Sequence, residues 1–271
     1  MSTNIITTIT NEQVDLATYI EMDRKAKKEE NARKLKELDK LVFAENKKIE
    51  YLNKNKIAHI SFNDTNGYVI SKVPNSIRKI LDERVTEAYT QCDERDSMHY
   101  ELVGNIEKQY PIPIDEELEK YVLGLCKHYF LKFPEYVRAQ ELFNGLSDKP
   151  SLEIFTLWVN FMKKTEFNPM HHHSGLFSFV IWHKIPYEFK TEILNSPSKR
   201  VDAFNTAGCF EFIFPNFSQT GVNQHSIMAD KKYEGVICIF PSYLNHVVWP
   251  FYSSDEYRIS IAGNVKIKNG A

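Results

Sequence analysis

Hydrophobic and polar positions change their pattern twice along the chain. Residues 11–55 contain no glycine or proline and are dense in Lys, Glu, Ala and Leu, which predicts one long charged helix capped near Asn11. Its apolar positions form a thin stripe, which is typical of a helix that lies across a larger domain. A coiled coil or a partner-binding arm is the alternative, although few of these positions keep a seven-residue repeat. For residues 1–10 we expect a frayed or strand-like start.

Residues 57–150 mix short strands with helices. The segments 57–62 and 68–70 flank the turn signal Asp64-Thr65-Asn66-Gly67, which predicts a β-hairpin. Apolar spacings of three and four then predict helices over 74–92 and 115–130 and a short helix between Pro134 and Gly145. Residues 93–114, between the first two of these helices, are polar and turn-like.

After Pro150 the pattern is that of strands. Short runs rich in Val, Ile, Phe, Trp and Tyr cover 151–163, 172–185, 208–214, 235–240, 246–250 and 257–265. Helices followed by many strands indicate an α+β fold whose second half is an antiparallel sandwich or barrel. We therefore divide the chain into a charged helical arm (1–56), a mainly helical support region (57–150) and a β core (151–271). The polar insertion 195–206 is a candidate lid.

Composition narrows the class of protein without identifying it. The chain has 271 residues, 42% of them hydrophobic, and a formal charge of −2, which gives no electrostatic ground for binding nucleic acid or a membrane surface. No apolar run approaches the ~18 residues of a spanning helix. The N-terminus does not resemble a signal peptide, and the four cysteines form no CxxC pair. We expect a cytoplasmic protein.

Three consecutive histidines are the main chemical signal. On a strand, His171 and His173 would share one face while His172 points to the other. Imidazole is the commonest neutral ligand for first-row transition metals, and His246, which follows a buried strand ended by a proline turn, is a third candidate ligand. A solvated or packed histidine is the ordinary alternative for each. Because the triplet lies at the head of an apolar run and His246 is a further candidate ligand, we favour a metal site.

A cation and a hydroxyl accompany the histidines. In the segment around Ile259, Arg258 and Ser260 share one strand face, and Ile259 and Ile261 share the other. A buried arginine requires an anionic partner. If no protein carboxylate provides it, a bound dicarboxylate would, since guanidinium and carboxylate pair through two parallel hydrogen bonds.

The order and spacing of four motifs carry a resemblance. They are Trp158-Val159-Asn160, Asn168-Pro169-x-His171-x-His173-Ser174-Gly175, Gly235-x5-Pro241-Ser242-x3-His246 and Arg258-x-Ser260-x5-Asn264. Together they resemble the Fe(II)- and 2-oxoglutarate-dependent oxygenases, and within them a prolyl-hydroxylase-like branch found in tailed phages. The resemblance covers about residues 98–265. It implies a double-stranded β-helix, or jelly-roll barrel, with flanking helices and the long N-terminal helix outside the matched part.

The resemblance also implies roles for single residues. His171 and His246 match the first and last metal ligands, and Arg258 matches the residue that binds the C5 carboxylate of 2-oxoglutarate, with Ser260 assisting. Asn160 would touch the cosubstrate or the substrate. The implied enzyme uses Fe(II), 2-oxoglutarate and O₂ to hydroxylate a substrate, with peptidyl proline as the family's suggestion and the host cytoplasm as its location if it is phage-encoded.

One position departs from the family. Where the family has Asp or Glu, this chain has His173, so a site of three imidazoles would leave the iron complex one unit more positive. We favour direct ligation by His173. The alternatives are a carboxylate from another strand, such as Glu211 or Asp230, or an inactive site. Halogenase chemistry is disfavoured because His173 would fill the position that a halide needs.

Two other classes of protein compete with this interpretation. A cupin-like three-histidine metalloenzyme would share the ligands but would need neither Arg258 nor Ser260. A non-catalytic viral structural or interaction protein on the same fold would use the helix 11–55 to bind a partner. The same helix offers a surface on which two copies of the chain could pair.

Overall fold

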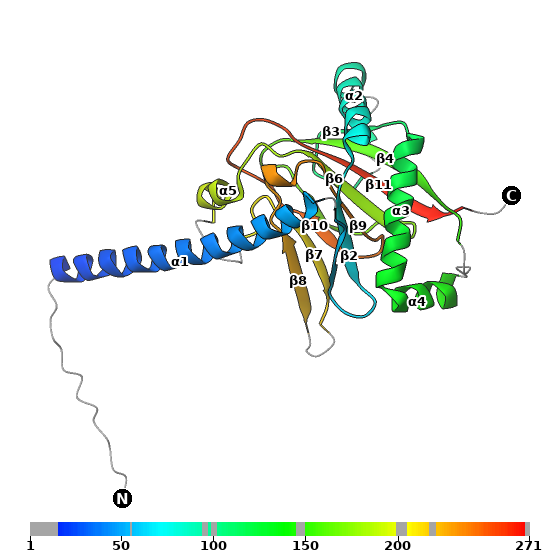
Figure 1. Ribbon diagram of the computed structural model, residues 1–271. Coiled ribbons are helices and arrows are strands. Elements are labelled where there is room, and N and C mark those ends of the chain that lie inside the picture. Colours follow the sequence, from blue (N-terminus) through cyan, green and yellow to red (C-terminus); the bar gives the residue numbers. More distant parts are fainter. Residues whose placement is uncertain are drawn as a thin grey trace, which may run out of the picture.

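Two antiparallel sheets face each other at the centre of the molecule, and a long helix projects from one side (Figure 1). The computed structural model describes residues 16–54, 56–93, 97–98, 102–144, 150–198, 205–216 and 221–268. The expected start at residues 1–10 and half of the candidate lid, residues 199–204, therefore lie outside the described residues. None of the helices in the described ranges is both long enough and apolar enough to cross a membrane.

The larger sheet has the strand order β1-β2-β9-β6-β11-β4-β3. Its strands are β1 (Ala58–Ser61), β2 (Gly67–Lys72), β3 (Lys108–Pro111), β4 (Leu152–Met162), β6 (Phe177–Lys184), β9 (Val236–Pro241) and β11 (Arg258–Ile267). Strands β1 and β2 are the predicted hairpin. Both faces of this sheet are covered, so β6 and β9 are nearly continuous apolar runs instead of alternating ones.

The smaller sheet has the order β5-β10-β7-β8. Its strands are β5 (Asn168–His171), β7 (Phe210–Pro215), β8 (Val222–Ile227) and β10 (His246–Val248). From β4 onward the chain passes repeatedly between the two sheets, with β4, β6, β9 and β11 in the larger one and the other four strands in the smaller. This is the eight-stranded jelly roll, or double-stranded β-helix, and the predicted α+β fold is confirmed.

Helices cover the outer face of the larger sheet. They are α2 (Asn75–Gln91), α3 (Glu116–Lys132) and α4 (Pro134–Asn144), which agree with the three predicted helices. Asp115 caps α3 by accepting hydrogen bonds from the backbone N–H groups of Glu117 and Leu118, at 2.9 and 3.3 Å. Buried side chains of these helices form one apolar cluster with outward-facing sheet residues such as Val159, Phe179 and Ile261.

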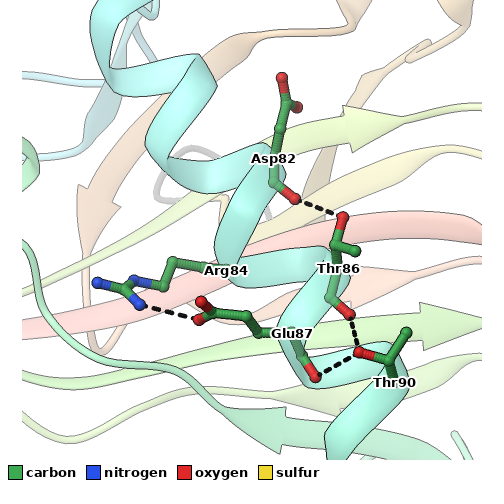
Figure 2. A network of polar contacts seen from close by, with 5 residues as sticks. All are labelled: Asp82, Arg84, Thr86, Glu87 and Thr90. Carbon is green, nitrogen blue, oxygen red and sulfur yellow. Dashed lines mark hydrogen bonds and ion pairs between the residues drawn. The ribbon is translucent and has the colours of Figure 1, made fainter.

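The exposed side of α2 is polar. Figure 2 shows Arg84 paired with Glu87 at 2.8 Å, while the hydroxyls of Thr86 and Thr90 donate to backbone carbonyl oxygens one turn earlier in the helix. The opposite side buries Ile77, Leu81, Val85 and Ala88. This division fixes which face of α2 lies on the sheet.

The buried side chains among the described residues of the long helix α1 (Leu16–Leu52) lie in its second half. Leu38 belongs to one apolar cluster together with Phe189 and Ile193 of α5 (Phe189–Asn195). Ile49 and Leu52 belong to a second apolar cluster, which also contains residues of both sheets. Glu45 accepts a hydrogen bond from Tyr233 of the short helix η3 (Lys231–Tyr233). The first half extends away from the core (Figure 1). The division of the chain at residues 56 and 150 stays a prediction.

Several local predictions were wrong. The sequence pattern joined the histidine triplet to the following apolar run, but His171 ends β5 in the smaller sheet and β6 lies in the larger one. The chain crosses between them at Gly175, whose φ of +100° disfavours any other residue. Strands β3 and β8 and helix α5 were missed, because their sequences are short and largely polar.

Candidate metal centre and its cavity

Three histidines converge where β5 and β10 lie side by side. His171 and His246 are directly opposite each other in the antiparallel ladder. His173 lies just beyond β5, where its backbone N–H donates to the carbonyl oxygen of Ser242 at 2.8 Å. The ring centroids of the three imidazoles are 4.3 to 5.1 Å apart, and one candidate ligand atom from each lies within 4.8 Å of the others. His172 is exposed and is not part of this group.

Two backbone carbonyls orient the imidazoles. The Nδ1 atom of His171 is 2.7 Å from the carbonyl oxygen of Pro169, and Nδ1 of His246 is 3.0 Å from that of Leu244. A carbonyl oxygen can only accept, so each Nδ1 carries the proton and each Nε2 keeps its lone pair. Such carbonyl contacts hold metal-binding histidines in their ligating tautomer.

Burial keeps all three imidazoles neutral. It lowers the pKa of His171, lowers that of His173 to about 4 and lowers that of His246 well below its ordinary value. The neighbouring imidazoles add to the lowering at His173 and His246, because two nearby positive charges repel each other. At neutral pH, protons therefore do not compete for the lone pairs that a metal would use.

The two carboxylates considered as alternative ligands lie elsewhere. Glu211 is opposite Val247 in the smaller sheet, so its side chain points away from the face that carries His246. Its oxygens accept from Ser226 and from the indole of Trp249, each at 2.8 Å. Asp230 accepts from the backbone N–H groups at the start of η3 and of α5. In the described part of the chain, no carboxylate joins the three histidines.

A cavity of about 300 Å³ opens beside the histidines. Asn160 and Ser260, both predicted to contact ligand, belong to its wall, and the amide nitrogen of Asn160 donates to the Ser260 hydroxyl at 3.2 Å. The remaining wall is apolar or carries uncharged polar groups. Among the described residues that line it, there is no Asp, Glu, Lys or Arg.

Arg258 is buried but does not line this cavity. Its guanidinium donates to the Tyr187 hydroxyl at 2.9 Å and to the carbonyl oxygens of Gly208 and Trp249 at 3.0 and 3.1 Å. The sulfur of Met162 lies 2.7 Å from Nη2. No carboxylate of the described segments forms an ion pair with Arg258. The structure thus brings five of the six predicted site residues to the cavity and leaves Arg258 next to it.

Two amide side chains of the wall were not predicted as site residues. Gln109 lies on β3, directly opposite Asn160 of β4, and donates to the Asn160 oxygen at 2.8 Å. Asn168 opens β5. Asn168 stood within a recognised motif but received no role, and Gln109 was missed because residues 93–114 were interpreted as turns. The alternation of Gln109 with Tyr110 was the available signal for a strand.

The β core matches a known family. Residues 156–264 match the model of the family described as "Putative 2OG-Fe(II) oxygenase". This segment extends from β4 to β11 and contains the three histidines, Asn160, Arg258 and Ser260. No curated protein matches the chain.

Solved structures with a similar arrangement have low sequence identity. A prolyl-4-hydroxylase from Pseudomonas putida is 13% identical, with a TM-score of 0.40 over 82% of this chain and 97% of that one. The non-heme alpha-ketoglutarate-dependent epimerase SnoN from nogalamycin biosynthesis is 14% identical, with a TM-score of 0.40 over 82% of each chain. A prolyl hydroxylase from Trichoplax adhaerens, in complex with a peptide fragment, is 13% identical, with a TM-score of 0.39 over 85% and 91%.

Proposed function

We propose that this chain, whose residues 156–264 belong to the superfamily of Fe(II)- and 2-oxoglutarate-dependent oxygenases, is a hydroxylase that holds iron on His171, His173 and His246. The observation that carries the proposal is the convergence of three neutral imidazoles, one buried and two partly buried, at the edge of a cavity. Their donor atoms suit a divalent first-row metal, and carbonyl groups orient two of the three rings.

The residues of the chain would bind and orient the iron, the cosubstrate and the substrate. The bound iron and 2-oxoglutarate would supply the oxidation. With 2-oxoglutarate and O₂, Fe(II) supplies the oxidising power that replaces a substrate C–H bond by C–OH, while 2-oxoglutarate becomes succinate and CO₂. The apolar wall of the cavity limits the access of water to the reacting groups. Asn160 and Ser260 offer hydrogen bonds to the cosubstrate from adjacent strands.

Arg258 is our proposed anchor for the far carboxylate of 2-oxoglutarate. It is a buried cation whose described partners are a hydroxyl, two carbonyls, a thioether and the ring of Phe251, none of which carries the negative charge that would neutralise it. A ligand carboxylate would provide that neutralisation. Since the Met162 sulfur covers Nη2, this thioether has to turn aside before a carboxylate can pair with that nitrogen.

The motifs of the chain resemble those of prolyl-hydroxylase-like proteins, so a prolyl peptide is the first substrate to test. The fold is shared by enzymes with many substrates and does not select among them.

Iron-dependent turnover of 2-oxoglutarate tests the proposal. We expect the wild-type protein with Fe(II) to form succinate without added substrate, and His171→Ala to abolish this turnover. Arg258→Ala is expected to weaken 2-oxoglutarate binding, with Arg138→Ala, an exposed change on α4, as the matched control. If the metal-loaded wild type neither binds nor consumes 2-oxoglutarate, the proposed function is wrong.

A three-histidine metalloenzyme that does not use 2-oxoglutarate is the second candidate. The observation in its favour is that Arg258 lies outside the cavity wall and already makes four contacts within the protein. Undiminished 2-oxoglutarate binding in Arg258→Ala would remove Arg258 from the cosubstrate site. Absence of binding in wild type that retains its metal would favour this second candidate.

A further inference from the structure

A buried hydrogen-bond acceptor in the cavity wall has no donor. Gln109 is 1% exposed, and its Oε1 atom makes no hydrogen bond with any residue that the structure describes. Leaving a buried acceptor unpaired is unfavourable, because no hydrogen bond compensates for the loss of its contact with water. Since few such groups persist in folded proteins, a ligand donor is a physical reason for this one.

The orientation of the Gln109 amide is fixed by its neighbours. The indole Nε1–H of Trp158 can only donate, and it lies 3.1 Å from Oδ1 of Asn160. That oxygen is therefore an acceptor, and the Gln109 atom 2.8 Å from it must be the donating Nε2. Oε1 of Gln109 is consequently the free acceptor, and exchanging its amide atoms would set two oxygens against each other.

A second amide oxygen without a donor lies close by. Asn168 Oδ1 is buried and makes no hydrogen bond within the described residues. Gly104 brings the two amides together, because a side-chain carbon built on it would lie 2.1 Å from Asn168 Oδ1 and 3.3 Å from Gln109 Nε2. Only glycine permits this close approach, so the two amides belong to one small region of the wall.

The cosubstrate cannot satisfy these acceptors. At neutral pH, 2-oxoglutarate carries two carboxylates and a ketone, all of which are acceptors. A hydrogen-bond donor on the substrate would satisfy them. A cationic donor would need an acidic side chain nearby, and the described lining has none. Leu102, Val103 and Ile106 add apolar surface beside the two amides.

We propose that Gln109 Oε1, with the Asn168 amide beside it, recognises an uncharged N–H or O–H donor on an otherwise apolar substrate, such as a carboxamide or an alcohol. This inference rests on the proposed function, because it assigns the acceptors to the substrate of that reaction. Gln109 is then a specificity-determining residue that leaves cosubstrate binding to other groups.

Four matched probes test this assignment: cyclopentanecarboxamide, cyclopentylmethanol, N,N-dimethylcyclopentanecarboxamide and cyclopentanecarboxylate. The first two have an uncharged donor, the third lacks it, and the fourth is an anion. Their dissociation constants are measured by NMR, once with Fe(II) and 2-oxoglutarate without oxygen and once with metal-free protein. Wild type should bind the carboxamide or the alcohol roughly tenfold more tightly than the dimethylamide, which equals about 1.4 kcal/mol.

The variant Gln109→Met keeps the size of the side chain, removes the acceptor Oε1 and also removes the amide group that donates to Asn160. It should bring this ratio close to one. Thr156→Val is the matched control, because the Thr156 hydroxyl in the same wall already accepts from Asn264 at 2.9 Å, and it should keep the wild-type ratio.

Either of two results would overturn the inference. One is that wild type shows no preference among the probes or binds none of them. This result does not depend on the folding of any variant. The other is an unchanged preference in Gln109→Met. Failure of the proposed function is recognised separately: 2-oxoglutarate would then not bind, whereas the probe preference would persist in metal-free protein.

Discussion

His173 stands at the position where a carboxylate is expected from the resemblance, and its surroundings favour ligation. The ring lies with those of His171 and His246, and burial lowers its pKa to about 4. Glu211 and Asp230 are engaged by other donors, so neither replaces it. With His173 as the proposed third ligand, the site would have three neutral ligands, and its net charge would be that of the ion alone.

His173→Ala should weaken Fe(II) binding by at least about tenfold, because one of three ligands is lost. His173→Asp should retain binding, since a carboxylate can ligate from the same position. Isothermal titration with Fe(II) under anaerobic conditions measures both, and the exposed neighbour His172→Ala is the control. Wild-type affinity in His173→Ala would show that His173 is not a ligand.

At the scale of elements, the crossing from β5 to β6 positions His173. Gly175 has a φ of +100°, and a Cβ on it would lie 2.7 Å from the carbonyl oxygen of Val265. Gly175→Ala should therefore lower both the free energy of unfolding, by about 1–3 kcal/mol, and the metal affinity. Gly124→Ala in α3 has open space around it and should raise stability by about 0.5–1 kcal/mol. Urea unfolding compares the two, and equal effects would contradict this account.

The helix α1 should stabilise the core only through its second half. Leu38 is 1% exposed, so Leu38→Ala should lower the free energy of unfolding by about 2–3 kcal/mol. Met22 is 61% exposed, and Met22→Ala should change the free energy of unfolding by less than about 0.5 kcal/mol. Denaturant titration of both variants measures the difference. A large loss in Met22→Ala would mean that the first half of α1 also packs, for instance against a second copy of the chain.

At the scale of the whole molecule, the buried histidines link stability to pH. Between pH 6.5 and about 4, the unfolded chain binds protons at His173 that the folded metal-free protein does not. The folded pKa is the lower one, so the free energy of unfolding should fall as pH decreases through this window. His173→Gln cannot titrate at this position and should reduce the slope. Thermal unfolding of metal-free protein at several pH values checks this.

The sequence predicted the strands and helices that have a strong local pattern. The hairpin β1–β2, helices α2 and α3 and the long strands β4 and β11 follow from apolar periodicity and turn residues, which act over a few positions. The interval 93–114, which contains β3, was interpreted as turns, because β3 gains its stability from pairing with β4 and not from its own residues. Location in the cytoplasm, origin in a phage and pairing of copies through α1 stay predictions.

For the site, the sequence by itself predicted which residues would carry the chemistry. The residues that it singled out lie at the ends of or within apolar runs and match the order and spacing of the motifs: His171, His173, His246, Arg258 and Ser260. Only the tertiary structure decided how they meet. Antiparallel pairing sets His171 opposite His246, turns Glu211 to the other face and brings Gln109 beside Asn160. Such pairings join residues far apart in sequence, and no local pattern encodes them.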